Sequence, residues 1–520
     1  MKNIGTMMFA LALMLNLSPP LMGQQQGDYR TRNSGNWGNA QIWERFNGVS
    51  WVAIGAPPAG SETITVRNVD SVFVNVATSI TGTLVNQGIV EPDVNLSIAN
   101  GGTYQHDRDG GRVPLATWQE GSTILITGVT AVAPNDRDQD YYNLTLNTPG
   151  LLSNLNLNLN GNTIGGDIRV INTGVARWYL TTALATDTSI VTIMGDVIVE
   201  AGAFSVQGTS NAQTTFVVHH YGNIEVTSGN FSIARGSQPG GTTTWYLYEG
   251  NFSLANATTQ SSTATPGGAK FVFAKAGTQT LALGQGNTLN ALPLEVSSGT
   301  TLDLGSSALA GSGIFMLKQG ATLTTALAGG VAEIFTTVVG AVTLEEGSGY
   351  GFNGTTAQVT SSRMPATVGD LIINNPAGVT LSQPTTINGV LRLIAGVFDN
   401  TIPFTLGPNG SISYEGGSLR VPVSVEAREQ NLPESFFVEQ NYPNPFNPST
   451  TIRFGLPAPS RVTVKIFNML GQEVATLFDG RKDAGRHDLQ FDAVNLSSGV
   501  YLYRIQTEEM VSMKQMILGK

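Results

Sequence analysis

The chain has 520 residues, too many for one ordinary domain of roughly 100–200 residues, so two to four domains or a repeat array are expected. Charged residues make up 12% of the chain, about half the ~25% usual in soluble domains, and the formal net charge of −10 argues against a nucleic-acid partner. Because the chain contains no Cys, disulfides, Cys-ligated zinc, iron–sulfur clusters and thiol nucleophiles are excluded.

Residues 1–23 are predicted to form a secretory signal peptide. Lys2 supplies the basic start, an apolar run follows over 4–17, and Gly23 precedes a polar stretch. The run is too short for a stable membrane span, although an uncleaved anchor is the alternative. No later segment reaches about 18 apolar residues, so no transmembrane helix is expected in the mature chain.

Residues 24–140 are predicted to form an N-terminal cap and the first coils of a β-helix. Trp37, Trp43 and Trp51 lie close together, and a strand with alternating apolar residues follows at 63–66. We interpret the Trp cluster as a cap over the open end of a repeat, with a carbohydrate-stacking site as the alternative. The Ser-Gly-Asn-Trp opening resembles that of secreted bacterial proteins that enter a right-handed β-helix. The stretch 101–129 resembles uncharacterised surface proteins of Bacteroidetes.

Residues 141–430 carry a repeat that predicts a β-solenoid. A Gly followed by Asp or Asn and an alternating apolar triplet begins at Gly166, Gly195, Gly222 and Gly250, in steps of 29, 27 and 28 residues. A second apolar run follows in each unit, and related segments at 142–146, 292–296, 313–317 and 389–393 extend the pattern with shorter steps. Repeats of about 20–30 residues made of strand, turn and strand are typical of solenoids, which bury one continuous apolar column. A string of β-sandwiches is the alternative.

The low charge is concentrated in this repeat. Residues 141–420 contain 23 charged side chains in 280 positions, about 8%. A charge at a stacked turn would lie ~4.8 Å from its copy on the next coil, which explains the depletion. The fold class is therefore all-β, a right-handed parallel β-solenoid followed by a small C-terminal domain.

Residues 431–520 are predicted to form that domain, a small Ig-like β-sandwich. The composition changes there, with 18 charged residues in 90. Short strands with alternating apolar residues are expected at 462–466 and 501–505, and several prolines keep the preceding segment extended. The most specific features are Asn441, Tyr442, Pro443, Asn444, Pro445, Phe446, Asn447, Pro448, Gly471, Gly499, Tyr501 and Lys514.

These residues resemble the C-terminal sorting domain of the type IX secretion system of Bacteroidetes and their relatives. The resemblance implies recognition by the outer-membrane secretion machinery and removal by a sortase-like protease. It also implies release of the cargo or attachment to surface lipopolysaccharide, so the protein is expected outside the cell or on the outer-membrane surface. The last strand, 514–520, is the expected determinant. An ordinary accessory Ig-like module is the alternative.

No catalytic, cofactor or metal site is predicted. Asp167 and Asp196 occupy the same turn position of successive coils and are interpreted as part of an Asx ladder rather than an acid–base pair. His219 and His220 must face opposite sides of a strand, and Glu345-Glu346 is interpreted as a solvated turn. The acidic loops at 106–111 and 135–140 resemble half of a calcium loop but lack its Gly and Glu.

The sequence thus predicts a non-catalytic secreted or surface-attached protein acting as a spacer, adhesin or matrix component. The alternative is a passenger that binds or degrades extracellular glycans, using aromatic residues such as Trp178 or Trp245.

Overall fold

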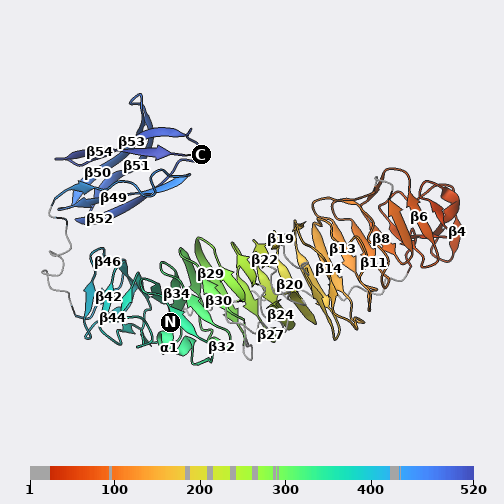
Figure 1. The fold of residues 1–520 in the computed structure, drawn as a ribbon, viewed down its shortest axis with the longest axis horizontal. Coiled ribbons are helices and arrows are strands. Elements are labelled where there is room, and N and C mark those ends of the chain that lie inside the picture. Colours follow the sequence, from red (N-terminus) through yellow and green to blue (C-terminus); the bar gives the residue numbers. More distant parts are fainter. Residues whose placement is uncertain are drawn as a thin grey trace, which may run out of the picture. The chain divides into compact units, whose positions relative to one another are not determined.

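A computed structural model of the protein describes residues 24–92, 96–181, 188–207, 215–234, 242–260, 268–284, 289, 292–421, 433 and 435–519. The predicted signal peptide lies outside these residues, as does the predicted boundary near residue 431. The chain divides into two compact units between Thr243 and Thr244, apart from residues 262–268, which group with the first. Figure 1 shows the strands of successive coils side by side within each unit.

The first unit begins with a cap. β1 (Tyr29–Thr31), β3 (Trp43–Phe46) and β4 (Trp51–Ala53) pair antiparallel, and β1 also pairs parallel with β5 (Thr63–Val66). Trp37 and Trp43 are buried with an edge-on ring contact at 5.0 Å, and the Trp43 Nε1–H donates to the Trp37 carbonyl at 2.9 Å. Two Trp residues of the predicted cluster are therefore buried in this antiparallel segment, whereas the third, Trp51, is only half-buried.

Parallel coils follow the cap. The principal sheet of this unit contains β5, β8 (Thr83–Asn86), β11 (Thr103–His106), β13 (Thr123–Ile126), β14 (Asn143–Asn147), β17 (Ile168–Asn172), β20 (Val197–Val199) and β23 (Ile224–Val226). The first five of these strands begin at intervals of 20 residues, a strict period that starts at Thr63. Two further parallel sheets complete the later coils: β15 (Leu155–Asn156), β18 (Arg177–Tyr179), β21 (Ala203–Gln207) and β24 (Gly229–Ala234) in one, and β16 (Thr163–Ile164), β19 (Thr188–Ile193) and β22 (Thr215–His220) in the other.

The core of the first unit is a column of stacked side chains. Ile64, Leu84, Tyr104, Ile124 and Leu144 are in register on successive strands and fully buried. Burial of each such side chain contributes roughly 1.5–3 kcal/mol, which one coil alone could not achieve.

Polar residues interrupt the neighbouring column. Asn86 and His106 are buried between Val66 and Ile126 of the same register. The Asn86 amide donates to the Tyr104 hydroxyl at 2.8 Å, which lies 3.3 Å from His106 Nδ1. The other His106 nitrogen, Nε2, donates to the Gly110 carbonyl at 2.8 Å, and burial lowers the pKa of His106 to about 4. The network therefore holds a neutral imidazole inside the coil.

The solenoid part of the second unit is built in the same way. One parallel sheet contains β26 (Phe252–Leu254), β29 (Gly277–Leu283), β31 (Thr300–Asp303), β34 (Thr322–Thr325), β37 (Gly349–Phe352), β40 (Leu371–Asn374), β43 (Val390–Ala395) and β46 (Ser411–Tyr414). Another contains β28 (Ala269–Phe273), β30 (Leu294–Val296), β33 (Phe315–Leu317) and β36 (Val342–Leu344). The parallel register of both units confirms the predicted β-solenoid.

Two of the repeat assignments are wrong. The sequence pattern places 292–296 and 313–317 with the first apolar triplet of each coil, but β30 pairs in register with Phe271–Phe273 of β28, which is the second apolar run. β33 in turn pairs with β30 in the same sheet. Alternating triplets followed by Gly occur on both faces of a coil, so sequence alone does not distinguish the faces.

Candidate functional site

The C-terminal module consists of two antiparallel sheets. One contains β48 (Phe437–Val438), β49 (Ser449–Leu456) and β52 (Gly485–Asp492), and the other β51 (Glu473–Lys482), β50 (Ser460–Asn468), β53 (Gly499–Gln506) and β54 (Val511–Leu518). The inward side chains of both sheets share one hydrophobic core, which includes Phe454, Val464 and Tyr503. The module is therefore a small β-sandwich, as predicted.

Asn441 organises the start of the segment 441–448. It is buried, and its side-chain amide donates to the Pro443 carbonyl at 3.1 Å and to the Thr450 hydroxyl at 2.9 Å. Its backbone N–H donates to the Tyr503 hydroxyl at 3.0 Å, which itself donates to the Glu439 carbonyl at 2.6 Å. Prolines have no backbone N–H group to donate, so this segment offers few backbone donors. The Asn441 side chain supplies donors of its own, to the Pro443 carbonyl and to the Thr450 hydroxyl.

The same segment is bound to the last strand. The Asn444 side chain accepts from the Ile517 N–H at 2.9 Å, and the Phe446 N–H donates to the Ile517 carbonyl at 2.9 Å. The Phe446 ring is buried in the core, 6.1 Å from Phe491. The segment therefore fastens β49 and β54, the first long strand and the last strand of the module.

Other residues of the segment face solvent. Tyr442 is 82% exposed, although its backbone pairs with Thr451 through two hydrogen bonds of 3.0 Å. Pro443, Pro445 and Asn447 are also exposed, and Pro448 is half-buried. The segment thus combines buried anchors with exposed residues between them.

The remaining predicted residues are dispersed over the module. Gly471 lies in the turn between β50 and β51 with a φ of +79°, and Gly499 begins β53. Tyr501 is buried and donates to the Ser497 carbonyl at 2.8 Å, whereas Lys514 is half-buried on β54 opposite Tyr503.

Sequence reasoning did not single out Thr450 and Tyr503, which complete the Asn441 network. Tyr503 could have been found from its strand, because Tyr501 and Tyr503 alternate with other residues and therefore point to the same face of the sheet.

In the solenoid, the Asx ladder is present and its oxygens are engaged. Asp167 accepts the Asp196 N–H at 2.8 Å, and Asp196 accepts the Asn223 N–H at 2.6 Å. Asn143 accepts the Asp167 N–H at 2.9 Å in the same way, and Asp370 accepts from Val390 at 2.7 Å. These side chains join one coil to the next at the turns.

The acidic loops are held by similar contacts. Asp109 accepts the N–H groups of Thr130, Ala131 and Val132 at 2.8–2.9 Å. Burial raises its pKa, but these donors outweigh that effect and lower the pKa below its usual range. In the second loop, Asp136 pairs with Arg112 at 2.6 Å, and Asp140 accepts the Thr163 N–H at 2.8 Å. Within the described residues, no group of three His, Asp or Glu side chains is placed to hold a metal ion.

The His and Glu candidates also have structural contacts. His220 is buried with Nε2 donating to the Gly195 carbonyl at 2.8 Å, while His219 is half-buried on the opposite face of β22. Burial lowers the pKa of His220 to about 4. Glu345 accepts from Lys318 of the preceding coil at 2.8 Å, so it forms an ion pair between coils rather than an isolated solvated turn.

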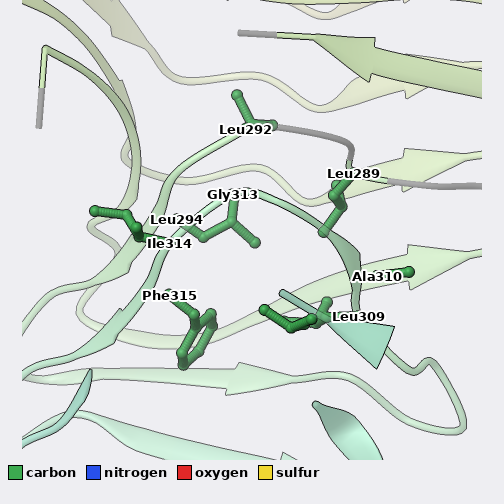
Figure 2. Close-up of a pocket in the computed structure, with 9 residues that line it drawn as sticks. Leu289, Leu292, Leu294, Leu309, Ala310, Gly313, Ile314 and Phe315 are labelled. Atoms are coloured by element: carbon green, nitrogen blue, oxygen red, sulfur yellow. The ribbon is translucent and has the colours of Figure 1, made fainter. Parts of the chain in front are cut away.

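Neither the Trp candidates nor the pocket in Figure 2 offers reactive groups. Trp178 and Trp245 are fully buried, which removes them as glycan-stacking residues. Nine residues, all apolar or Gly, line the pocket, including Leu289, Leu309 and Phe315. No helix in the described ranges is long and apolar enough to cross a membrane.

Comparison with known families identifies the C-terminal module. Residues 440–519 match the family described as secretion system C-terminal sorting domain, which covers the segment 441–448 and strands β49 to β54. No curated protein and no solved structure matches the chain.

Proposed function

We propose that this protein, whose C-terminal module is a type IX secretion sorting domain, is a non-catalytic β-solenoid displayed at the cell surface as a spacer or matrix component. A sorting domain of this kind implies export across the outer membrane. The solenoid is then the passenger, and the module acts as its address. The observation that carries the proposal is the family match over 440–519, which coincides with the segment that fastens β49 to β54.

The contacts of the acidic residues support a non-catalytic passenger. Asp167, Asp196 and Asp109 each accept a backbone N–H from the next coil. An acid–base pair requires carboxylates that reach a substrate together, whereas these maintain the stacking of the coils. Incubation of the purified chain with plant and microbial polysaccharides should therefore release no new reducing ends.

We further propose that a sortase-like protease removes the module at the surface and that the solenoid is then attached to lipopolysaccharide or released. Mass spectrometry of the surface-derived protein tests this step. A solenoid that still carries residues 441–448 would contradict it.

Deletion of residues 431–520 tests the export proposal. The truncated protein should accumulate in the periplasm of the native host, whereas the full chain should be accessible to protease added outside the cell. A fusion of residues 431–520 to a periplasmic reporter is the matched gain-of-function control. Surface delivery of the truncated protein would refute the proposal.

A further inference from the structure

The buried network around His106 contains one atom without a hydrogen-bond partner. Asn86 is 1% exposed, and Tyr104 and His106 are fully buried. Within the described residues, Asn86 Oδ1 accepts no hydrogen bond, although the Nδ2–H of the same amide donates to the Tyr104 hydroxyl at 2.8 Å. A buried polar atom without a partner destabilises the fold, so its presence has to be offset by a role of the amide.

Packing does not supply that role. Asn86 of β8 is in register with Val66 of β5 and with His106 of β11, and Ile126 of β13 continues the same column. An apolar side chain at residue 86 would extend the contacts of Val66 and leave no polar atom unpaired. The role of the amide therefore lies in its connection to Tyr104 and His106.

The Gly110 carbonyl fixes the direction of the hydrogen bonds. A carbonyl oxygen accepts, so His106 Nε2, which lies 2.8 Å from it, carries the proton of the neutral imidazole. Nδ1 is then the acceptor, and it receives the Tyr104 hydroxyl proton across 3.3 Å. Burial raises the pKa of Tyr104 above its ordinary range, so the hydroxyl keeps its proton. The chain therefore runs from Asn86 Nδ2–H to the Tyr104 hydroxyl and from there to His106 Nδ1.

A second proton on the His106 ring changes these requirements. Nδ1–H becomes a donor to the Tyr104 oxygen, so the hydroxyl hydrogen needs another acceptor. Among the described residues, the other side chain bonded to that hydroxyl is Asn86. A half-turn of the amide exchanges Nδ2 and Oδ1, and because Oδ1 holds no partner, the turn gives up only the bond that is being reversed.

The charges around His106 oppose one another. Asp107 favours the protonated ring and Arg108 disfavours it, and both belong to the loop that follows His106. The residues in the same column on β5 and β13, Val66 and Ile126, are uncharged. Burial is therefore the main influence, and it places the uptake of the proton in the acid range, with a pKa of about 4.

We propose that Asn86, Tyr104 and His106 form a hydrogen-bond chain that reverses its direction when His106 takes up a second proton. In the protonated state, His106 Nδ1–H donates to the Tyr104 oxygen, and the Tyr104 O–H donates to Asn86 Oδ1. The Nε2–H bond to the Gly110 carbonyl is the same in both states, so it continues to hold the loop 106–111. This device lets the coil accept a proton in acid without releasing that loop.

A pH titration of the full chain, followed by NMR of isotope-labelled histidine, tests the reversal. Asn86→Val fits the apolar column but removes the acceptor that the protonated state needs, so the His106 midpoint should fall by about one pH unit. Without reversal, Asn86 serves the neutral state alone, and its loss would leave the midpoint unchanged or raise it. In a Tyr104→Phe background, Asn86→Val should no longer move the midpoint. Buried His220 on β22 is the internal control, because its midpoint should be the same in all variants.

A measurement on the unsubstituted chain keeps the test decisive if Asn86→Val is unfolded. The side-chain amide protons of Asn86 leave the Tyr104 hydroxyl when the chain reverses, so their resonances should shift with the same midpoint as His106. Three results would overturn the proposal: Asn86 resonances that stay constant while His106 titrates, a His106 midpoint that does not fall in folded Asn86→Val, or loss of the Nε2–H bond to Gly110 on protonation.

Discussion

The close approach of successive coils predicts that Gly222→Ala destabilises the solenoid. A Cβ at this position would lie 2.1 Å from the Gly195 carbonyl oxygen and 2.6 Å from the Asp196 nitrogen. Both are backbone atoms of the preceding coil, so no side-chain rotation relieves the clash. The φ of Gly222 is outside the left-handed region, so the substitution tests steric stacking alone.

The nearest hydrogen bonds set the magnitude. The Asn223 N–H donates to Asp196 at 2.6 Å, and the Val197 N–H donates to the Asn223 carbonyl at 2.8 Å. Separating the coils weakens both, at about 0.5–1.5 kcal/mol each. Overpacking adds about 1–3 kcal/mol. We therefore expect the free energy of unfolding to fall by about 3 kcal/mol or more.

Urea unfolding followed by circular dichroism measures this loss, and hydrogen exchange in β20 and β23 locates it. Gly161→Ala is one control, because Gly161 has a φ of +83° but no atom within 4 Å of an added Cβ. It should cost about 1–2 kcal/mol from backbone strain alone. Gly55→Ala meets neither obstacle and should stay within about 0.5 kcal/mol of the parent. Equal midpoints for Gly222→Ala and Gly55→Ala would refute the stacking argument.

Two further predictions concern protons and calcium. Burial lowers the pKa of His106 and His220 to about 4, so their contribution to stability is complete above about pH 6.5 and declines as the pH falls toward 4, by up to about 3 kcal/mol each. Urea midpoints measured across this range should fall less steeply for His106→Gln with His220→Gln; parallel curves would contradict the assignment. Calorimetric titration of calcium into the EDTA-treated full chain should release no heat, because Asp109 already accepts three backbone N–H groups. Calcium binding that is lost in Asp109→Ala would contradict this prediction, because it would show that the Asp109 carboxylate can still ligate a metal ion.

Local regularity made much of the architecture predictable. The spacing of Gly166, Gly195 and Gly222 predicted parallel coils, and the strands that follow these glycines are paired in register. The Asx row followed from the chemistry of turns, since Asp and Asn side chains accept hydrogen bonds from nearby backbone N–H groups. The segment 441–448 identified the sorting domain because its prolines and asparagines are contiguous in the sequence, so they can be recognised without knowledge of the tertiary structure.

Contacts between distant residues were decided only by the tertiary structure. An alternating strand has two faces, and only stacking fixed which residue points inward: Trp245 is buried, whereas Tyr246 lies outside. Likewise, the pairing of β30 with β28 depends on how many residues separate the strands of successive coils. The alternation of apolar residues within a strand does not reveal this number. Sequence therefore determined that the chain coils and that it carries a secretion sorting domain, because both depend on local patterns. The three-dimensional stacking decided which side chains form the core and which lie on the outer faces, because that depends on register between coils.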